Sequence, residues 1–531
     1  MNHPSLVTLE RDSAPRTLFS GDRLIEVDFP PGTRVIYPKA PVEPLKDPQA
    51  AIRYALNHPL GSEPLYAKLR PGMKVTVAVD DISLPLPPMR RPDVRERVLN
   101  VLLELLADHG VEDIEIIVAT GVHRRMKAHE IRHMVGDKVF DAYWPDRLYN
   151  HDAEDRANLV TIGETDHGEK LTLNRRAAES DLLVYVNMTF VPMNGGYKSV
   201  AVGLCDYESL RSHHNPASIR ASDSYMDPAK SRLAHDIGRL GRLAHKKLPI
   251  FSIETTINNR MFDPTLDFLM KNEDDLTGRE RALSKALVVS TAKLPQPARQ
   301  AIFDRFPAPY GMTGVWAGNV EEVHARAIEK SFEQYCVPIE GQADVLVFGV
   351  PYISPYNVHA FLNPLLVQVL AQGYLFNMYR GMPLVKKGGT LVIFHPCTDK
   401  FDHEQHAPYI DFVHRLLPET RDANVLRDRY EEKFARDPAL IQMFRTGHAY
   451  HPSHPFFMWY WGENGRQHLG RVIVVGADNE YIPKLFGWET SPSLEDALYR
   501  AKNGQARSLD VTLLHVPPIV MGDMSRSGGA P

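Results

Sequence analysis

The sequence is poor in cysteine, has no long apolar run and carries little net charge. Its three cysteines, Cys205, Cys336 and Cys397, include no CxxC pair, which disfavours both a disulfide scaffold and a cysteine zinc site. The 61 Lys and Arg residues against 66 Asp and Glu residues give a net charge of −5, so neither nucleic acid nor an anionic membrane is favoured as a partner. No run of 18 apolar residues predicts a membrane span, and the first twenty residues predict no secretory signal. We therefore expect a cytoplasmic protein.

The remaining composition is that of a folded globular protein. Hydrophobic residues make up 43% and charged residues 24% of the 531 residues, and a chain of this length predicts two or three domains. Histidine is abundant, with 23 residues. Because histidine binds metals and carries protons near neutral pH, the question is which histidines do either. The composition gives no indication of the oligomeric state.

Apolar, β-branched runs alternate with helical patterns along the chain. Residues 74–80, 113–120 and 181–190 have the composition of buried strands, and apolar residues at helical spacing predict a helix over 92–110. The C-terminal half repeats this pattern, with predicted strands at 344–350, 389–395, 471–476 and 509–516. Strands separated by helices indicate parallel pairing through crossover connections. The expected fold is α/β, with two Rossmann-like α/β domains, mainly parallel sheets and a cleft between them.

Domain boundaries follow from this alternation. We expect an N-terminal α/β domain over residues 1–330 that carries the cofactor anchor and the catalytic loops, and a C-terminal α/β domain over 331–520. The charged, helix-prone residues 260–310 are a candidate insertion or lid. Residues 521–531 are small and polar at their end and are expected to form a flexible tail.

Three loops that follow predicted strands carry reactive side chains. In open parallel sheets, sites form beyond the carboxyl ends of the strands. The first loop contains Asp80 and Asp81, the second His123, and the third Gly195-Gly196-Tyr197-Lys198-Ser199. We therefore expect three kinds of side chain at one edge of the sheet: a carboxylate, a histidine that can act as a general base, and a lysine. The lysine follows two glycines, which allow the backbone to approach a ligand closely. Structural roles remain open for each: a capping carboxylate, a satisfied loop histidine and a flexible surface loop.

Two other groups of histidines are candidates for metal binding. One of the adjacent His213 and His214 is a candidate metal ligand, and solvent-exposed cap residues are the alternative. His448, His451 and His454 have a spacing of three within GHAYHPSHPFFMWYW. This proline-containing run is weak as a zinc motif and is expected to form a packed aromatic loop.

An ordered set of motifs resembles the nickel-dependent lactate racemase family of nickel-pincer nucleotide racemases and epimerases. Asp81-Ile-Ser-Leu84-Pro85-Leu-Pro87 stands where the family has Asp-x-Thr-Arg-Pro-x-Pro, and Gly121-Val-His123-Arg124 where it has Gly-Thr-His-Arg. Asn150-His151-Asp152-Ala153 matches an Asn-His-Asp-Ala stretch, and Gly195-Gly196-Tyr-Lys198-Ser199 resembles Gly-Gly-Arg-Lys-Ser. His214 lies at the family's distance beyond the lysine. The similarity covers most of residues 70–400.

The resemblance implies a nickel-pincer nucleotide, a pyridinium mononucleotide with two sulfur-bearing arms and a carbon–nickel bond. It implies that Lys198 is its covalent anchor and His214 the protein's nickel ligand, in the tetragonal geometry that nickel prefers. Backbone amides of the loop from Gly195 and Gly196 to Ser199 would help to hold the phosphate. His123 would remove the hydroxyl proton of the substrate, and Asp81 is grouped with it as catalytic.

The sequence departs from the family pattern at three positions. The arginine before the first proline is Leu84, the second catalytic histidine is Met188, and no lysine falls near Leu375. These departures indicate a substrate other than lactate, either a hydroxy acid or a polyhydroxy compound. Nearby residues are candidates to replace what is lost. Arg90, Arg91, Arg124 or Arg125 would supply the positive charge, and His213 or Tyr197 would serve as the second proton carrier.

The predicted function is therefore that of a racemase or epimerase working by reversible hydride transfer, with cofactor-biosynthesis proteins as partners. One alternative is a family member that binds the cofactor without racemising a substrate. Another is an ordinary α/β oxidoreductase or metal hydrolase with accidental motif matches.

Overall fold

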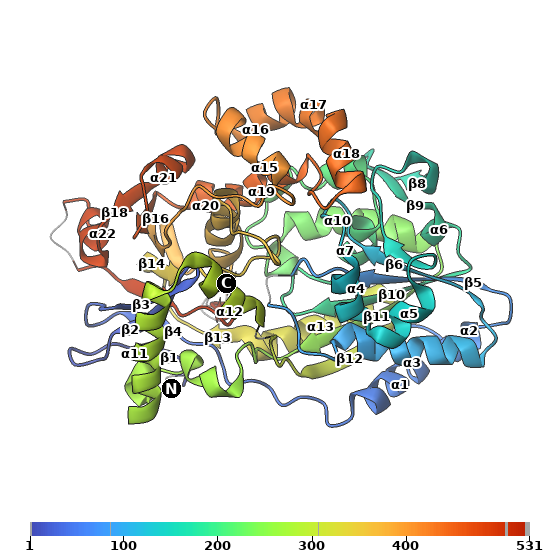
Figure 1. Cartoon of the computed structure of the whole chain (residues 1–531), viewed down its shortest axis with the longest axis horizontal. Helices are drawn as coiled ribbons and strands as arrows, with labels where there is room; N and C mark the ends of the chain where they lie inside the picture. Colours follow the sequence, from blue (N-terminus) through green and yellow to red (C-terminus); the bar gives the residue numbers. More distant parts are fainter. Residues whose placement is uncertain (1–2, 85–86, 306, 505–507, 526–531) are drawn as a thin grey trace, which may run out of the picture.

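The computed structural model describes residues 3–84, 87–305, 307–504 and 508–525 and arranges them around two main sheets that lie side by side (Figure 1). The first sheet has six strands in the order β12-β11-β10-β5-β6-β7, and the second has seven in the order β1-β4-β19-β14-β16-β17-β18. The strands of the first are β5 (Lys74–Asp80), β6 (Asp113–Ala119), β7 (Leu148–Asn150), β10 (Leu182–Thr189), β11 (Ile250–Ile257) and β12 (Met312–Gly318). The strands of the second are β1 (Leu6–Thr8), β4 (Arg34–Ile36), β14 (Ala343–Gly349), β16 (Val385–Phe394), β17 (Arg471–Val475), β18 (Glu489–Ser491) and β19 (Val511–Leu514).

Pairing within the two main sheets is mainly parallel. In the first sheet β12 alone among the paired strands runs antiparallel to its neighbour, β11. In the second, β1 runs antiparallel to β4, and the other neighbours are parallel. The predicted α/β fold with mainly parallel sheets is confirmed.

The helix after β5 shows how capping residues and apolar spacing in the sequence predict a helix. Helix α3 (Val94–Asp108) begins after Asp93, whose carboxylate accepts a hydrogen bond from the Arg95 backbone N–H. It ends just before Gly110, which has a φ of +70°, the conformation that glycine adopts without steric cost. Its apolar stripe, including Val98 and Leu102, is fully buried.

The two ends of the chain differ from the expected domain boundaries. Strand β4 pairs in parallel with β19, so residues near the N-terminus complete the sheet of the C-terminal half. Strand β20 (Met521–Asp523) pairs with β13 (Cys336–Pro338) and β15 (Tyr379–Arg380), so the start of the expected flexible tail is a strand. Its Met521 side chain is fully buried, and this long-range contact has no local signal. Residues 526–531 of that expected tail lie outside the described residues.

Residues 260–310, the expected insertion or lid, pack against a hairpin near the N-terminus. They form η3 (Pro264–Met270), η4 (Glu273–Asp275), α11 (Gly278–Lys293) and α12 (Gln296–Arg305). Arg16 of strand β2 (Arg16–Ser20) is fully buried and forms ion pairs with Glu273 at 3.1 Å and Asp274 at 2.6 Å. This contact anchors the segment to the N-terminal hairpin; residue 306 is not among those described.

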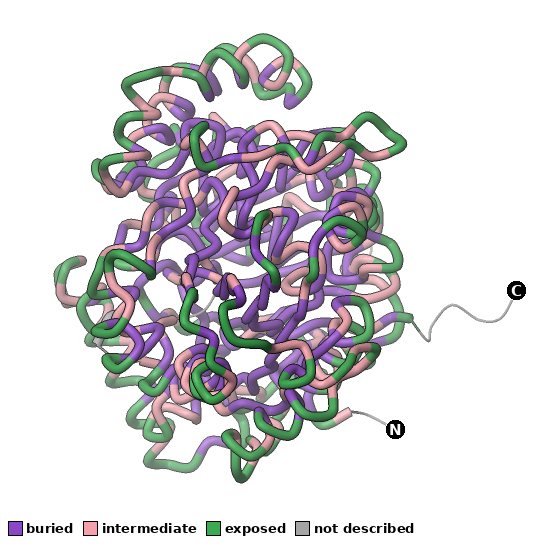
Figure 2. The backbone as a smooth tube through the Cα atoms, turned by 90° about the vertical axis from the view of Figure 1, so that its right-hand side faces the viewer, coloured by how far each residue is buried: buried purple, intermediate pink, exposed green. Residues whose placement is uncertain are grey.

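The hydrophobic core is shared by the two halves. One cluster of buried side chains includes Val77 of β5 and Leu183 of β10 together with Leu346 of β14 and Leu391 of β16. Figure 2 shows buried backbone through the interior and exposed backbone at the periphery. Over the described ranges, no helix is both long and apolar enough to cross a membrane.

Candidate active site

The carboxyl ends of three neighbouring strands in the first sheet meet one hollow of about 730 Å³. Strand β5 lies between β10 and β6, so the loops that follow these strands lie side by side. Of the predicted site residues, all except one line this hollow, which we call the central cavity: Asp81, His123, Gly195, Lys198, Ser199 and His214. The exception, Gly196, lines an adjoining hollow that shares Gly195 and Lys198 with the central cavity.

His123 and Asp81 form a hydrogen-bonded pair. The distance from His123 Nδ1 to Asp81 Oδ2 is 2.9 Å, and Asp81 is almost fully buried. Burial alone would raise the pKa of Asp81, but the facing His123 and the hydrogen bonds from Ser83 outweigh it and lower the pKa. With Asp81 ionised, Nδ1 of His123 carries the proton and Nε2 is left to accept one. This is the arrangement of a general base oriented by a carboxylate.

Lys198 begins helix α7 (Lys198–Gly203) at the floor of the central cavity. In the described part of the chain its ammonium group has no ion pair with any acid. Burial lowers the pKa of Lys198 to about 8, with Asp81 opposing the shift. A lysine with such a pKa has an appreciable unprotonated fraction near neutral pH, and an unprotonated amine is nucleophilic.

His214 lies between α8 (Tyr207–Arg211) and α9 (Pro216–Arg220) and contacts its neighbour through its ring. Its Nδ1 is 2.7 Å from Nδ1 of His213, so one of these nitrogens donates to the other. Burial lowers the pKa of His213 to about 4 and that of His214 well below its usual value. Both imidazoles are therefore neutral at pH 7, and Nε2 of His214 is available as a ligand if its Nδ1 is the donor.

Two of the three departures from the family pattern line the central cavity. Leu84 is 8% exposed and Met188 is 1% exposed. Neither carries a charge or an ionisable group. Leu375 lines a different, apolar cavity instead.

The four arginines proposed as substitutes for the lost charge are engaged elsewhere. Arg90 pairs with Asp263 at 3.1 Å, and Arg91 with Asp137 at 3.1 Å. Arg124 is buried and pairs with Glu130 at 2.6 Å, and Arg125 donates to the backbone carbonyl of Arg445 at 2.7 Å. None of the four lines the central cavity.

The two proposed substitutes for the second proton carrier also lie outside the central cavity. Tyr197 lines the adjoining hollow, where its ring packs against Gly241 of helix α10 (Arg232–Lys247). His213 is fully buried, and neither residue lines the central cavity.

The C-terminal half contributes an aromatic wall to the central cavity, and no local pattern in the sequence predicts it. Tyr356 follows β14, Tyr374 lies in η5 (Val369–Leu375), and Trp461 ends α19 (His454–Trp461). Trp461 belongs to the aromatic run that was predicted to be a packed loop. The run is indeed packed, since every residue of α19 is buried, and the same helix also supplies part of the cavity wall.

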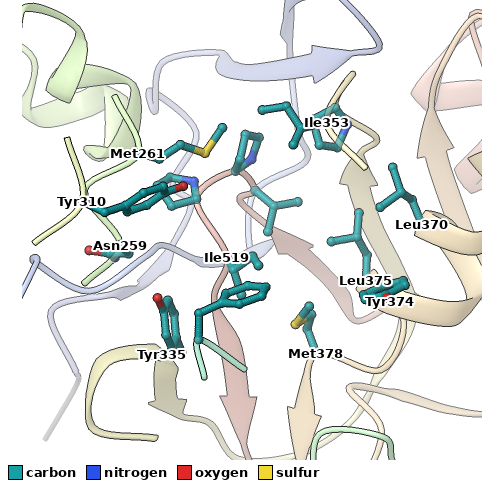
Figure 3. A pocket seen from close by; sticks show the side chains of 15 residues that line it. Asn259, Met261, Tyr310, Tyr335, Ile353, Leu370, Tyr374, Leu375, Met378 and Ile519 are labelled. Atoms are coloured by element: carbon teal, nitrogen blue, oxygen red, sulfur yellow. The ribbon is translucent and has the colours of Figure 1, made fainter. Parts of the chain in front are cut away.

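An apolar cavity lies behind Tyr374, which lines both spaces (Figure 3). In Figure 3 the side chains of Met261, Tyr310, Ile353 and Met378 surround it. None of the predicted catalytic or cofactor-binding residues lines this cavity.

Comparisons with known proteins find relatives for part of the chain. Residues 20–226 match the family described as the lactate racemase N-terminal domain. A lactate racemase of Lactiplantibacillus plantarum is 26% identical over 178 residues, which is 33% of this chain and 40% of that protein. One of Thermoanaerobacterium thermosaccharolyticum is 25% identical over 169 residues, or 31% of this chain and 37% of that protein. The matched segments therefore span less than half of these curated relatives.

The fold extends the likeness beyond the matched segment. The structure of the lactate racemase apoprotein from Thermoanaerobacterium thermosaccharolyticum aligns with a TM-score of 0.62 at 17% identity, covering 96% of this chain and 100% of that one. At this identity the alignment shows a shared fold. With its motifs in the family's order and residues 20–226 matching the family's N-terminal domain, the chain is similar to the lactate racemase family in this part of its length.

Proposed function

We propose that the protein is a nickel-pincer-nucleotide-dependent racemase or epimerase that acts at a hydroxyl-bearing carbon by reversible hydride transfer, on a substrate other than lactate. The observation that carries the proposal is the convergence of Lys198, His214 and the His123–Asp81 pair on one cavity. The similarity to lactate racemases supports racemase chemistry.

The residues present fit the proposed cofactor. Lys198 offers a buried amine with a lowered pKa, which suits a covalent anchor. His214 offers one neutral imidazole, and within the described ranges no three His, Cys, Asp or Glu side chains are placed to hold a metal ion among themselves. A single imidazole fits a nickel ion whose other ligands come with its cofactor. The turn at Gly195 and Gly196, with φ of +80° and +58°, brings backbone close to Lys198 and suits a phosphate.

When bound, the cofactor would supply the hydride acceptor. In the proposed mechanism, His123 takes the hydroxyl proton of the substrate at Nε2 as the carbinol carbon is oxidised, and Asp81 stabilises the imidazolium that forms. His123 later returns the proton to the same oxygen. Since Met188 cannot carry a proton, one imidazole serves both directions in this proposal. Tyr356, Tyr374 and Trp461 exclude water from the reacting carbon.

The residues of the cavity wall support a substrate other than lactate. Leu84 and Met188 replace the family's arginine and second histidine there, and the four nearby arginines have other partners. A carboxylate beside the reacting carbon would have none of these guanidinium groups to bind.

The test is to produce the chain together with the cofactor-biosynthesis enzymes and to measure intact mass and nickel content. The proposal expects nickel and a mass increase on Lys198, both lost in Lys198→Arg. Epimer formation is then followed over a panel of hydroxy acids, sugar acids, diols and sugars. We expect His123→Ala to lower turnover by about 10² to 10⁴, whereas His167→Ala, at an exposed position outside the cavity, should leave it unchanged.

Each other outcome points to a different function. Nickel and a modified Lys198 without epimer formation on any compound would indicate a cofactor carrier. Turnover supported by NAD without nickel would indicate an ordinary oxidoreductase. Full turnover in His123→Ala would refute the assignment of the base.

A further inference from the structure

The central cavity has acid and aromatic walls but few cations. Lys198 is the one Lys or Arg residue among the described residues that line it. If Lys198 carries the cofactor, as proposed above, its amine is no longer available as a cation. A substrate bound there then meets Asp80 and Asp81, and no further Lys or Arg among the described lining residues is left to bind a negative charge on the substrate.

Arg95 illustrates how positive charge is kept away from the substrate. Its guanidinium is buried, pairs with Asp93 at 2.8 Å and donates to the backbone carbonyl of Asp81 at 2.7 Å. It donates to the backbone carbonyl of Asp80 at 3.4 Å, and its nearest approach to a carboxylate oxygen of Asp80 is 4.0 Å. Arg95 therefore supports the loop after β5 from behind and does not itself line the central cavity.

Besides Oδ1 of Asn194, two polar atoms of cavity-lining residues have no hydrogen-bond partner within the described protein. One is Oδ1 of Asp80, whose other oxygen accepts from the backbone N–H of Met188 at 2.9 Å. The second is the indole N–H of Trp461, a residue that is 2% exposed. Buried polar groups are normally hydrogen-bonded. Both atoms are covered by their neighbours, so a ligand in the cavity pairs with them after a small shift of these side chains.

A hydroxyl group suits either atom, because it donates to a carboxylate and accepts from an indole N–H. A carboxylate accepts only, and it would lie beside Asp81, whose pKa is lowered and which is therefore negatively charged at neutral pH. The aromatic wall of Tyr356, Tyr374 and Trp461 offers apolar ring faces to the C–H groups of such a compound.

We infer that the substrate of this site is a neutral polyhydroxylated compound, a polyol or a sugar, and not a 2-hydroxy acid. The inference rests on the proposed function for the type of reaction, whereas the preference for a neutral substrate follows from residues of this chain alone. The replacement of the family's arginine by Leu84 is then a determinant of substrate charge.

The test uses pairs of compounds with one carbon skeleton and different charge: propane-1,2-diol with lactate, and D-glucitol with D-gluconate. Binding is measured by calorimetry on the protein produced with the cofactor-biosynthesis enzymes, and epimer formation is measured on the same samples. We expect the neutral member of each pair to bind at least about 10-fold more tightly and to be the one that is epimerised. Equal binding, tighter binding of the acid, or no binding of either neutral compound would overturn the inference.

A variant separates charge from shape. Leu84→Arg places a guanidinium at the cavity wall and is expected to shift the binding ratio at least about 10-fold towards the acid. Leu84→Met, of similar size and without charge, should keep the original ratio, and thermal melting checks that both variants fold. An unchanged ratio in Leu84→Arg, with its fold intact, would count against the inference.

The two proposals fail in distinguishable ways. An unmodified Lys198 without nickel refutes the proposed function, while the binding ratio still reports the charge of the preferred ligand. A modified Lys198 with nickel and a preference for the acids refutes the substrate class alone.

Discussion

Lys198 shows how far a single buried position can change the chemistry of a side chain. Its pKa falls from 10.5 to about 8 because burial disfavours the ammonium form. Gly195, three residues earlier, is held in a positive-φ conformation beside two polar groups. Both features follow from contacts that no local pattern specifies, and each supports a prediction at the residue scale.

Labelling of Lys198 by an amine-reactive reagent should show a midpoint near pH 8. The unprotonated amine reacts, so labelling should rise through pH 8 and level off at about one to two pH units above it, whereas labelling of ordinary exposed lysines still increases towards pH 10 and beyond. Competitive labelling followed by peptide mass spectrometry of the cofactor-free protein measures both. A midpoint for Lys198 at the value of the exposed lysines would contradict the prediction.

Gly195→Ala should destabilise the protein more than Gly388→Ala, although both glycines have nearly the same φ, +80° and +77°. A Cβ at Gly195 would lie 2.2 Å from Thr189 Oγ1 and 2.3 Å from Glu254 Oε1, whereas at Gly388 it meets nothing within 4 Å. We expect about 1 kcal/mol for Gly388→Ala from backbone strain alone and at least about 2 kcal/mol more for Gly195→Ala from overpacking. Urea unfolding gives both values, and equal losses would show that the turn relaxes freely.

At the scale of elements, one buried carboxylate joins two elements to the turn before Lys198. Glu254 of β11 is fully buried and is 2.7 Å from Nδ1 of His324 on α13 (Val320–Tyr335). It also accepts hydrogen bonds from Thr189 and from the backbone N–H of Gly196. The glycine turn is thereby fixed to the first sheet and to the helix that leads into the second half.

The His324–Glu254 pair should make stability depend on pH. Burial alone would lower the pKa of His324, but the charge and hydrogen bond of Glu254 outweigh it and raise the pKa. Because the folded pKa exceeds the unfolded one, this stabilisation is full below about pH 6.5. It is lost as the pH rises through the folded pKa.

We therefore expect His324→Gln to cost about 2 kcal/mol at pH 5.5 and clearly less at pH 9, as measured by urea unfolding at both values. His167→Gln, an exposed position, serves as the control and should show little change. A loss in His324→Gln that is the same at both pH values would exclude a charged pair.

At the scale of the whole molecule, the two sheets are not products of separate halves of the chain. Residues of β4 pair with β19 near the other end of the chain, and one hydrophobic cluster runs through both halves. The central cavity likewise takes its acids, Lys198 and His123 from one half and the aromatic wall of Tyr356, Tyr374 and Trp461 from the other. Both the fold and the site depend on the assembled chain.

The segment 331–525 produced alone should therefore lack a cooperative urea transition, because the edge of β19 that β4 covers is left open. Joining residues 3–40 to it through a flexible linker should restore cooperativity and solubility. Circular dichroism against urea measures both. An equally cooperative transition in the unlinked segment would show that the N-terminal strands are dispensable.

The sequence by itself determined the α/β class, most of the central strands and the loops that carry the reactive groups. These features are local. Strand β5 has the bounds that its apolar run predicts, Lys74–Asp80. Reactive residues that follow parallel strands converge because of the geometry of the sheet. Asp81, His123 and Lys198 were predicted in this way, whereas His214 was implied by the resemblance to the family, and the roles of all four are proposals.

Only the tertiary structure decided which partners these residues have. The ion pairs that occupy Arg90, Arg91 and Arg124 and the aromatic wall with Tyr356 and Trp461 all depend on contacts between distant segments. The entry of β4 into the second sheet depends on such a contact too. The physical reason is that strand period and loop position follow from neighbouring residues, whereas ion pairing, burial and pKa values depend on what the folded chain places opposite each group.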